Sequence, residues 1–543
     1  MSAIPDAVPA DTPPVTLTPN CLPAWGVADL PEPEPLAWRQ WTRFVGPGVV
    51  MMGVQIGGGE WLFGPEITAR YGGGLMWIAT IAIVVQVFYN LECGRYALYC
   101  GEPIFTGFMR LRPGPTFWVV FFLLLSAGAI IPGLASHGGA VLATLYLGHP
   151  AGLEDRPLVM AMAYGCLVAV VIPVLFGGRV YDSLQAIMSA KVVVVLGFSF
   201  AMGVLFVAPA NWWNVVSGFA KFGSVPVADG RGGEVVVNAF SSYARTGTWP
   251  LVSMANIAVL GAFAGYAGGG GLANSLYSNF VRDKGWGMGS RVGAIPSAIG
   301  GKHVALSHLG KVFPLGPENL RRWGGWWRYI LVDQVFIWAP GCFVGMALPA
   351  LMSLEFAPHS SLYRRHAKMD WAQAVIGADG LRHYPGLGPA LANGLWAAML
   401  LVGLAVLLPS QMSVVDEVSR RWTDVIWSAN ARVRRDLGRG QVKYIYYSIL
   451  AAYVVWCVIS MYLFTQFGTP KLMTMVIANL GNVAIGFTSF LTLRVNCRLL
   501  PPALRPRWYH RLGLLACGVF YLGLACLVFV EKQWPVLRGW LGL

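Results

Sequence analysis

The stretch Gln55-Ile56-Gly57-Gly58-Gly59-Glu60-Trp61 interrupts an apolar run, residues 44–69, that is long enough to cross a bilayer. Three consecutive glycines weaken a helix, because each costs about 1 kcal/mol relative to alanine in a helix interior. The carboxylate of Glu60 follows directly, at a depth where ionisable groups are costly and usually functional. The stretch therefore predicts a membrane helix that breaks near its middle and forms part of a binding site there.

The composition is that of a membrane protein. Of the 543 residues, 56% are hydrophobic and only 12% are charged, whereas about a quarter of a typical soluble protein is charged. The net charge of +14 does not indicate a nucleic-acid partner, since the basic residues fall between apolar runs and no soluble basic domain is present. We therefore expect an all-α polytopic membrane protein with the lipid bilayer as its surroundings.

Cysteines and glycine motifs give no sign of an enzyme or a cofactor. The nine cysteines are scattered without paired spacing, so we interpret them as small packing residues rather than a disulfide or zinc framework. The glycine runs lack the Lys-Ser/Thr of a P-loop and the βαβ context of a dinucleotide site. No His/Cys/Asp cluster has the spacing of a catalytic metal site. We predict neither an enzymatic activity nor a cofactor.

Apolar runs of about 20 residues predict about eleven membrane spans. These are residues 44–69, 75–99, 116–147, 158–176, 187–208, 250–281, 327–352, 388–412, 444–467, 472–493 and 512–530. Lysines and arginines concentrate in the loops expected after spans six, eight and ten, with Arg420 and Arg421 among them. The positive-inside rule then predicts a cytoplasmic N-terminus, in a multi-pass monomer of the cell (inner) membrane.

The break in span one has a counterpart in span six, where Gly268-Gly269-Gly270-Gly271 follows Tyr266-Ala267. Each broken span begins a block of five spans, and an odd block length inverts the second block. The expected divisions are a disordered cytoplasmic tail (1–38), a first repeat (39–209), an extracellular loop (210–248), a second repeat (249–496) with an extracellular segment (355–386), and a last helix (497–543).

Paired glycine-broken spans are typical of the substrate sites of secondary transporters, because unwound backbone exposes carbonyl and N–H groups that hold cations or anions. The glycines could instead serve close helix packing, although consecutive glycines fit that pattern poorly. The expected substrate-binding residues are Ile56, Gly57, Gly58, Gly59, Glu60, Tyr266, Ala267, Gly268, Gly270, Asn274 and Gln411.

The sequence Phe44-Val45-Gly46-Pro47-Gly48-Val49, followed by the broken span, resembles the start of Nramp-type divalent metal transporters of the APC superfamily. The similarity continues through Trp61, Gln86 and Gly94-Arg95-Tyr96-Ala97, and Pro409-Ser410-Gln411-Met412-Ser413 is similar to the family's Gln-Ser motif. The resemblance implies the LeuT fold, with an inverted 5+5 repeat and broken helices one and six. It also implies alternating access, in which spans one, two, six and seven move against three, four, eight and nine.

The family's metal motifs are altered in this chain. The Asp-Pro-Gly-Asn motif falls on Gly57–Glu60, and Met-Pro-His falls on Gly270-Gly271-Leu272, so the thioether ligand is absent. The resemblance then implies a metal site formed by Glu60, Gly57 and Gly270. Because such a site offers only oxygen ligands, it would suit Mn²⁺ or Mg²⁺ as the transported ion.

Proton coupling is expected to be weak or absent. The family's span-six histidines are replaced, and span three has no acid, only His137. His137 could be a proton relay, although a hydrogen-bonded packing role is more typical. Glu92 and Arg95 lie three residues apart near the end of span two and form either an ion pair or a gate. Asp333 is expected to pair with Arg328.

Two other functions remain open beside divalent-cation transport. In a transporter of a small organic solute such as an amino acid or amine, Glu60 would pair with an ammonium group. Trp61, Phe263 and Tyr266 would then line an apolar pocket. The chain could also be a non-transporting sensor or scaffold.

Overall fold

The first broken span forms two helices at an angle to each other. The computed structural model describes residues 22–35, 46–176, 179–231, 233–299, 304–363, 369–437 and 441–541. Helix α2 (Pro47–Gln55) begins with a proline, which is suited to a first helical turn, and it ends before the three glycines. A π-helical turn, η2 (Gly59–Phe63), then leads into α3 (Gly64–Tyr71). The predicted break in this span is present.

The second break is wider. Helix α12 (Ile257–Tyr266) ends at Ala267, and the chain resumes as the short turn η6 (Ala273–Leu276) and helix α13 (Tyr277–Lys284). All four glycines from Gly268 to Gly271 have positive φ, at 80°, 125°, 68° and 62°. Four successive residues in this region require glycine, because a side chain would make the conformation strained. The glycine run therefore fixes the break as predicted.

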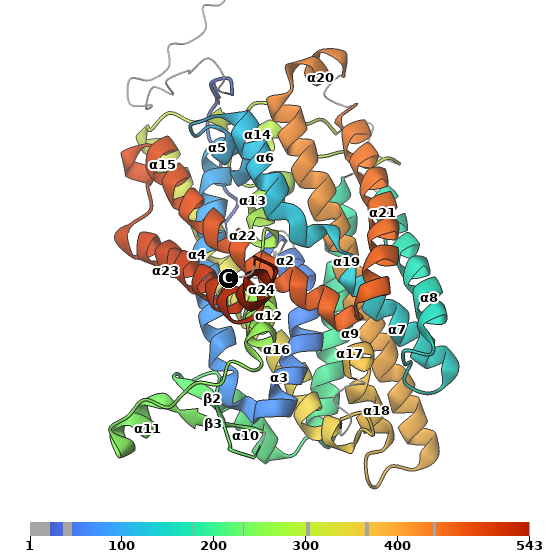
Figure 1. Cartoon of the computed structure of the whole chain (residues 1–543). Coiled ribbons are helices and arrows are strands. Elements are labelled where there is room, and N and C mark those ends of the chain that lie inside the picture. The colour runs from blue at the N-terminus through green and yellow to red at the C-terminus, as the bar shows by residue number, and fades with distance from the viewer. Residues whose placement is uncertain are drawn as a thin grey trace, which may run out of the picture.

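The other helices pack around these two broken ones (Figure 1). Five of them precede the second break: α4 (Trp77–Cys100), α6 (Pro115–Leu125), α7 (Gly133–Leu147), α8 (Arg156–Ala169) and α9 (Val180–Phe206). The later ones are α15 (Pro317–Leu331), η7 (Val332–Trp338), α16 (Ala339–Phe356), α19 (Pro389–Ala429), α21 (Val442–Phe467), α22 (Pro470–Leu499) and α23 (Trp508–Val528).

Among the described residues, eight helices are long and apolar enough to cross a membrane. The three expected spans that fail this test, 44–69, 116–147 and 250–281, are each divided into shorter helices. Division of the span 116–147 was not predicted: α6 passes into the 3₁₀ turn η4 (Ser126–Ile130) before α7 begins. The count of eleven spans and their orientation remain predictions.

Two helix boundaries were predicted wrongly. The seventh expected span begins at Pro317 rather than at residue 327, and α19 continues to Ala429 rather than ending at residue 412. Arg420 and Arg421 are therefore buried within α19 and do not lie in a loop. Their charges are offset by carboxylates: Arg420 pairs with Asp416 at 3.0 Å and also with Asp283, and Arg421 pairs with Glu417.

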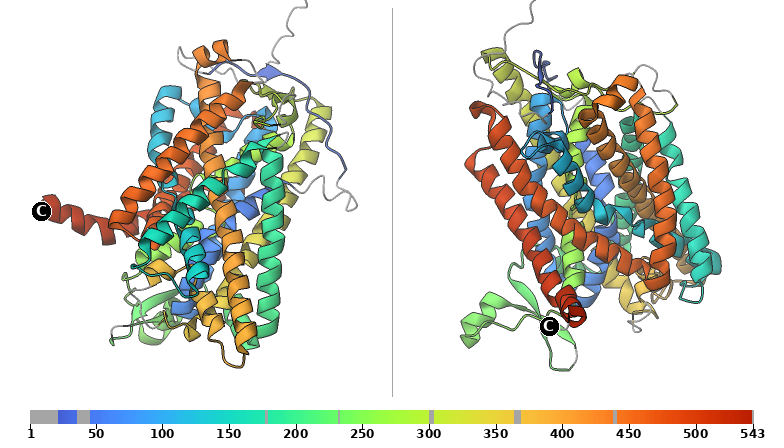
Figure 2. Two further views of the ribbon diagram at one scale, coloured as in Figure 1. Left: turned by 90° about the vertical axis from the view of Figure 1, so that its right-hand side faces the viewer. Right: turned by 45° about the horizontal axis from the view of Figure 1, so that its top comes forward.

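Small elements cover both ends of the bundle. In Figure 1 one end carries α5 (Ile104–Met109), α14 (Gly289–Val292) and α20 (Ala431–Asp436). The opposite end carries α10 (Pro209–Gly218), the antiparallel pair β2 (Ser224–Ala228) and β3 (Glu234–Asn238), α11 (Ala239–Thr246), α17 (Met369–Ala372) and α18 (Ile376–Arg382). The last helix, α24 (Trp534–Leu541), projects from the bundle in Figure 2.

The expected disorder of the N-terminal tail is wrong for residues 22–35. Strand β1 (Gly26–Val27) pairs in parallel with β4 (Lys311–Val312). Leu30 is fully buried, and its N–H donates to Asn319 Oδ1 at 3.2 Å. Apolar and backbone contacts thus hold a segment whose composition resembles a disordered tail. Residues 1–21 and 36–38 lie outside the described residues.

Candidate functional site

The two breaks lie against each other at the centre of the bundle. A Cβ atom placed on Gly59 would lie only 2.6 Å from the carbonyl oxygen of Tyr266. A Cβ atom on Gly58 would be 3.3 Å from the Tyr266 ring and 3.4 Å from Leu134. The ring of Tyr266 also stacks on Phe63, with centroids 5.8 Å apart. The glycines of the first break therefore allow the backbone of the second break to pack directly on it.

Glu60 joins the two breaks through hydrogen bonds to backbone. One carboxylate oxygen accepts from the N–H of Gly57 at 3.0 Å, and the other accepts from the N–H of Gly268 at 3.5 Å. The side chain is buried, with 1% of its surface exposed. Unwound helices leave N–H groups of this kind without intrahelical partners, and a carboxylate satisfies them well. Glu60 thus faces the backbone of both breaks.

Lys191 is the charged side chain that the sequence analysis missed. It lies on α9, is buried, and its ammonium group donates to Ser410 Oγ at 2.5 Å. Ser410 Oγ in turn lies 3.5 Å from the carbonyl oxygen of Ile56 in the first break. Lys191 also interacts electrostatically with Glu60. The signal was present in the sequence, because Lys191 is a lone ionisable residue in the expected span 187–208.

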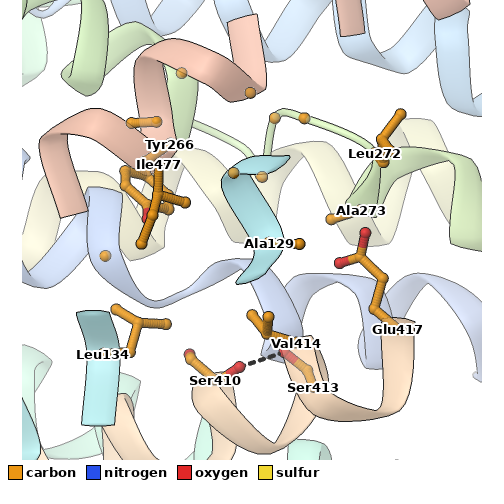
Figure 3. A pocket seen from close by; sticks show the side chains of 18 of the residues that line it. Ala129, Leu134, Tyr266, Leu272, Ala273, Ser410, Ser413, Val414, Glu417 and Ile477 are labelled. Atoms are coloured by element: carbon orange, nitrogen blue, oxygen red, sulfur yellow. Dashed lines mark hydrogen bonds between the residues drawn. The ribbon is translucent and has the colours of Figure 1, made fainter. Parts of the chain in front are cut away.

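A pocket opens beside the two breaks. Its empty volume, including its open mouth, is about 910 Å³, and its lining is largely apolar. Figure 3 shows side chains from several helices around it, including Leu134 of α7, Tyr266 of α12, Ser410 of α19 and Ile477 of α22. The cavity proper has a volume of about 120 Å³. This is close to the roughly 150 Å³ of an engineered cavity that binds benzene, so there is room for a small organic molecule.

Only part of the expected substrate site lines this pocket. Gly58, Tyr266, Gly270 and Gln411 are in its wall. The other expected residues lie behind the wall: Ile56, Gly57, Gly59, Glu60, Ala267, Gly268 and Asn274. Asn274 in particular turns towards α4, where its amide donates to Gln86 at 2.9 Å and to Asn90 at 3.0 Å.

Several break carbonyls already accept hydrogen bonds from the protein. The carbonyl of Gly57 accepts from the N–H of Trp61 at 2.9 Å, and that of Tyr266 accepts from Gly269 at 3.1 Å. The carbonyl of Ala267 accepts from the amide of Gln86 at 2.8 Å. In the part of the chain that the structure describes, there is no group of three or more His, Cys, Asp or Glu side chains placed to hold a metal ion. The expected metal site therefore has one side-chain ligand, the carboxylate of Glu60, because Gly57 and Gly270 can offer only backbone oxygens.

The residues considered as relay or gate have local partners. His137 is buried between α7 and α22, with Nε2 3.4 Å from Thr474 Oγ1. Glu92 and Arg95 form an ion pair at 2.9 Å, and Asn496 donates to Glu92 at 2.8 Å. These contacts hold α7 and α4 against α22, and a role of the three residues as relay or gate stays a prediction.

Asp333 does not pair with Arg328 as expected. One of its carboxylate oxygens accepts from the N–H of Gly48 at 2.9 Å, and the other accepts from the hydroxyl of Tyr277 at 2.9 Å. Asp333 therefore connects η7 to the start of α2 and to α13, because the first N–H groups of a helix need an acceptor outside the helix.

The chain shares its fold with solved structures of the manganese transporter of Eremococcus coleocola. One variant of that protein matches with a TM-score of 0.61 at 13% identity, over 94% of this chain and 92% of that chain. A second variant gives 0.60 at 14% identity, over 94% and 92%. A complex of the same transporter with an aromatic bis-isothiourea substituted compound gives 0.58 at 13% identity, over 95% and 93%.

These matches confirm the fold implied by the resemblance to Nramp-type transporters. The chain is a multi-pass helical membrane protein of that architecture. At 13–14% identity the likeness concerns the fold alone. No protein-family model matches the sequence, and a comparison with curated proteins finds no match.

Proposed function

We propose that this chain is a secondary transporter that moves a small solute by alternating access around the two broken helices. The observation that carries the proposal is the pocket beside the breaks, together with the bond from Glu60 to both of them. Broken helices at mid-membrane depth are costly, and transporters use them to contact substrate. The proposed setting is the cell (inner) membrane, with the protein acting as a monomer.

A polar network supports a moving unit made of four expected spans. Glu60 links the two breaks, and Asp333 of η7 links to α2 and α13. On α4, Gln86 donates to Ala267 of the second break, and Asn90 accepts from Asn274 and donates to Gln334 of η7. Elements joined by several buried hydrogen bonds move together more readily than apart. These are spans one, two, six and seven.

Lys191 and Ser410 belong to helices outside that unit. Both lie on elements against which the first break packs, α9 and α19. A displacement of the breaks past these helices would change the separation of Lys191 and Glu60, whose charges attract each other strongly in a medium of low dielectric constant. The pair would therefore favour one arrangement of the moving unit, and a substrate that binds near it would shift the balance.

Buried ion pairs join α13 to α19 at the end of the bundle that carries α14 and α20 (Figure 1). Arg282 of α13 bonds Asp424 of α19 at 2.6 Å, and Arg420 of α19 pairs with Asp283 of α13. Asn279 adds a hydrogen bond to Asp424 at 2.6 Å. Opening of that end would separate α13 from α19 and break these bonds.

The site favours a small organic solute as substrate. A divalent cation that loses its water needs about six oxygen ligands. The breaks offer one carboxylate, which accepts two N–H bonds, and the buried amine of Lys191 is bonded to Ser410 beside the first break. A largely apolar cavity of about 120 Å³ is larger than a dehydrated ion requires and is similar in size to a cavity that binds benzene.

The second candidate is transport of Mn²⁺ or Mg²⁺ with weak or no proton coupling. The presence of Glu60 where the family has a metal ligand favours it. Each oxygen of this carboxylate keeps a second lone pair beside its bond from Gly57 or Gly268, and cation transport would use these lone pairs as ligands.

Uptake by purified protein in liposomes tests the proposal. The panel would hold radiolabelled amino acids, amines and short carboxylic acids, with Mn²⁺ measured separately by a fluorescent indicator. We expect saturable uptake of at least one organic solute and no uptake of Mn²⁺. Saturable Mn²⁺ uptake alone would establish the second candidate, and no uptake of any member would contradict transport.

A further inference from the structure

Two glutamine residues in the pocket wall have amide groups whose N–H donors are unused. Gln55, at the end of α2, and Gln411, on α19, both line the pocket. Both amide nitrogens are buried and have no hydrogen-bond partner among the described residues. Other buried polar atoms without such a partner belong to residues outside the pocket wall. A buried donor left unpaired is unfavourable, and in a pocket wall a bound ligand with acceptor oxygens would satisfy it.

The orientation of Gln55 follows from its neighbour. Its amide oxygen accepts a hydrogen bond from Nε1 of Trp338. An indole N–H can only donate, so the oxygen of Gln55 must face Trp338 and the NH₂ group must face the other way. The assignment of oxygen and nitrogen is therefore fixed by chemistry.

Gln411 is oriented in the same way. Its amide oxygen accepts from the backbone N–H of Ala135 at 3.1 Å. A backbone N–H also only donates, and the NH₂ group of Gln411 therefore cannot exchange places with the oxygen. In consequence Gln411 cannot offer its oxygen to a cation without losing this bond.

The second break makes room for the Gln55 amide. A Cβ atom on Gly269 would lie 2.3 Å from Gln55 Nε2, and Gly269 has a φ of 125°. Only glycine readily adopts this φ and also leaves space for the amide of Gln55.

The other polar side chains of the wall are already engaged. Ser413 donates to the carbonyl of Ser410 at 2.6 Å, Ser410 accepts from Lys191, and Glu417 pairs with Arg421. The wall thus has donors to spare at Gln55 and Gln411, close to the positive charge of Lys191, whose partner Ser410 precedes Gln411 in the chain.

We propose that Gln55 and Gln411 recognise a carboxylate group, so that the substrate is a small organic acid or amino acid. The two oxygens of a carboxylate accept from the two amides, and the apolar wall takes the rest of the molecule. Lys191 adds a favourable field without direct contact. The proposal rests on the proposed transport function and names the substrate class of the same pocket.

The test uses the full chain in lipid nanodiscs. Binding of acetate, butyrate, benzoate, L-alanine and L-leucine is compared with binding of butyramide, butylamine and MnCl₂, by calorimetry and thermal shift. The variants are Gln55→Glu and Gln411→Glu, which keep an oxygen for Trp338 or Ala135 and replace the donor by a negative acceptor. Gln533→Glu, at an exposed position on η12 (Phe529–Gln533), is the matched control.

We expect at least one carboxylate to bind, the matched amide and amine to bind less tightly, and each variant to weaken carboxylate binding by about tenfold or more. The control should bind as the wild type does. Because either variant could disturb folding, the wild-type preference for carboxylate over amide is an independent readout.

The proposal is overturned if no carboxylate binds, or if binding is equal in the variants and the wild type. Failure of the transport function gives a different result. Carboxylate binding without uptake into liposomes would contradict transport and support the carboxylate site. Uptake of an amine or Mn²⁺ without carboxylate binding would support transport and contradict the carboxylate site.

Discussion

The carboxylate of Glu60 accepts a hydrogen bond from the backbone N–H of Gly268, a residue 208 positions later in the chain. This hydrogen bond connects the first break to the second. The other carboxylate oxygen of Glu60 accepts from the N–H of Gly57, within the first break. A buried carboxylate satisfied by N–H groups is well suited to hold two unwound segments at a fixed separation. The rest of the site is arranged around this connection.

Substitution of Gly59 tests the direct packing of the breaks. We expect Gly59→Ala to lower the free energy of unfolding by about 1–3 kcal/mol, because the new methyl group would lie 2.6 Å from the backbone oxygen of Tyr266, which cannot move aside. Gly165→Ala, on α8, meets no atom within 4 Å and should be neutral or stabilising. Thermal unfolding of both variants provides the measurement, and equal melting temperatures would contradict the packing.

Removal of the ammonium group of Lys191 should impair transport. We expect Lys191→Met to reduce uptake by about tenfold or more, since the hydrogen bond to Ser410 and the electrostatic interaction with Glu60 would both be lost. Lys221→Met, at an exposed position beyond α10, should transport normally. Uptake by Lys191→Met at the wild-type rate would show that Lys191 has no part in the transport cycle.

Much of the fold was predictable because its determinants are local. The glycine runs specify both breaks through the backbone angles that only glycine adopts, and apolar runs specify the helices. The residues of the site were harder to predict. The direction of Glu60 depends on Gly268, and the burial of Arg420 within α19 depends on Asp283, so each is set by a residue far away in the sequence.

Lys191 and the N-terminal segment were missed for different reasons. One charge among apolar neighbours leaves residues 187–208 with the hydropathy of a membrane span, so the hydropathy pattern that predicts the span does not single out Lys191. Residues 22–35 have the composition of a disordered tail. Burial of Leu30 and pairing of β1 with β4 nevertheless hold them against the bundle.

The docking of that segment predicts a stability effect. We expect Leu30→Ala to cost about 2–4 kcal/mol, because the fully buried side chain would leave a cavity. Glu32→Gln should cost less than about 1 kcal/mol, since the ion pairs of Glu32 with Arg321 and Arg322 are solvent-exposed. Thermal unfolding compares the two variants, and equally small effects would contradict docking of residues 22–35.

A buried ion pair just beyond the end of α4 predicts an acid-sensitive contribution to stability. Glu102 pairs with Arg110 and accepts from the N–H of Gly310 at 2.9 Å. Burial acts to raise the pKa of Glu102, but the Arg110 guanidinium and these hydrogen bonds outweigh it and hold the pKa below its ordinary value. A lowered pKa stabilises the fold above the pKa of the unfolded chain, about 4.3, and the benefit is lost as the pH falls through the folded-state value.

We therefore expect Glu102→Gln to be less stable than the wild type at pH 7 by about 3 kcal/mol, since Arg110 would remain buried without its partner. The difference should narrow as the pH falls below about 4.3. Melting temperatures of both proteins between pH 7 and pH 3.5 provide the measurement. A difference that stays constant with pH would show that this carboxylate is not the acid-sensitive group.

Uptake by Glu60→Gln in liposomes tests the central claim most directly. The measurement uses the solute that the wild type transports best, with Glu531→Gln, at an exposed position on η12, as the matched control. We predict that Glu60→Gln lowers uptake by about tenfold or more, because a neutral amide can offer only one acceptor oxygen to the two N–H groups of Gly57 and Gly268. The control should transport normally. Uptake by folded Glu60→Gln at the wild-type rate would contradict the assignment of the two breaks as the transport site.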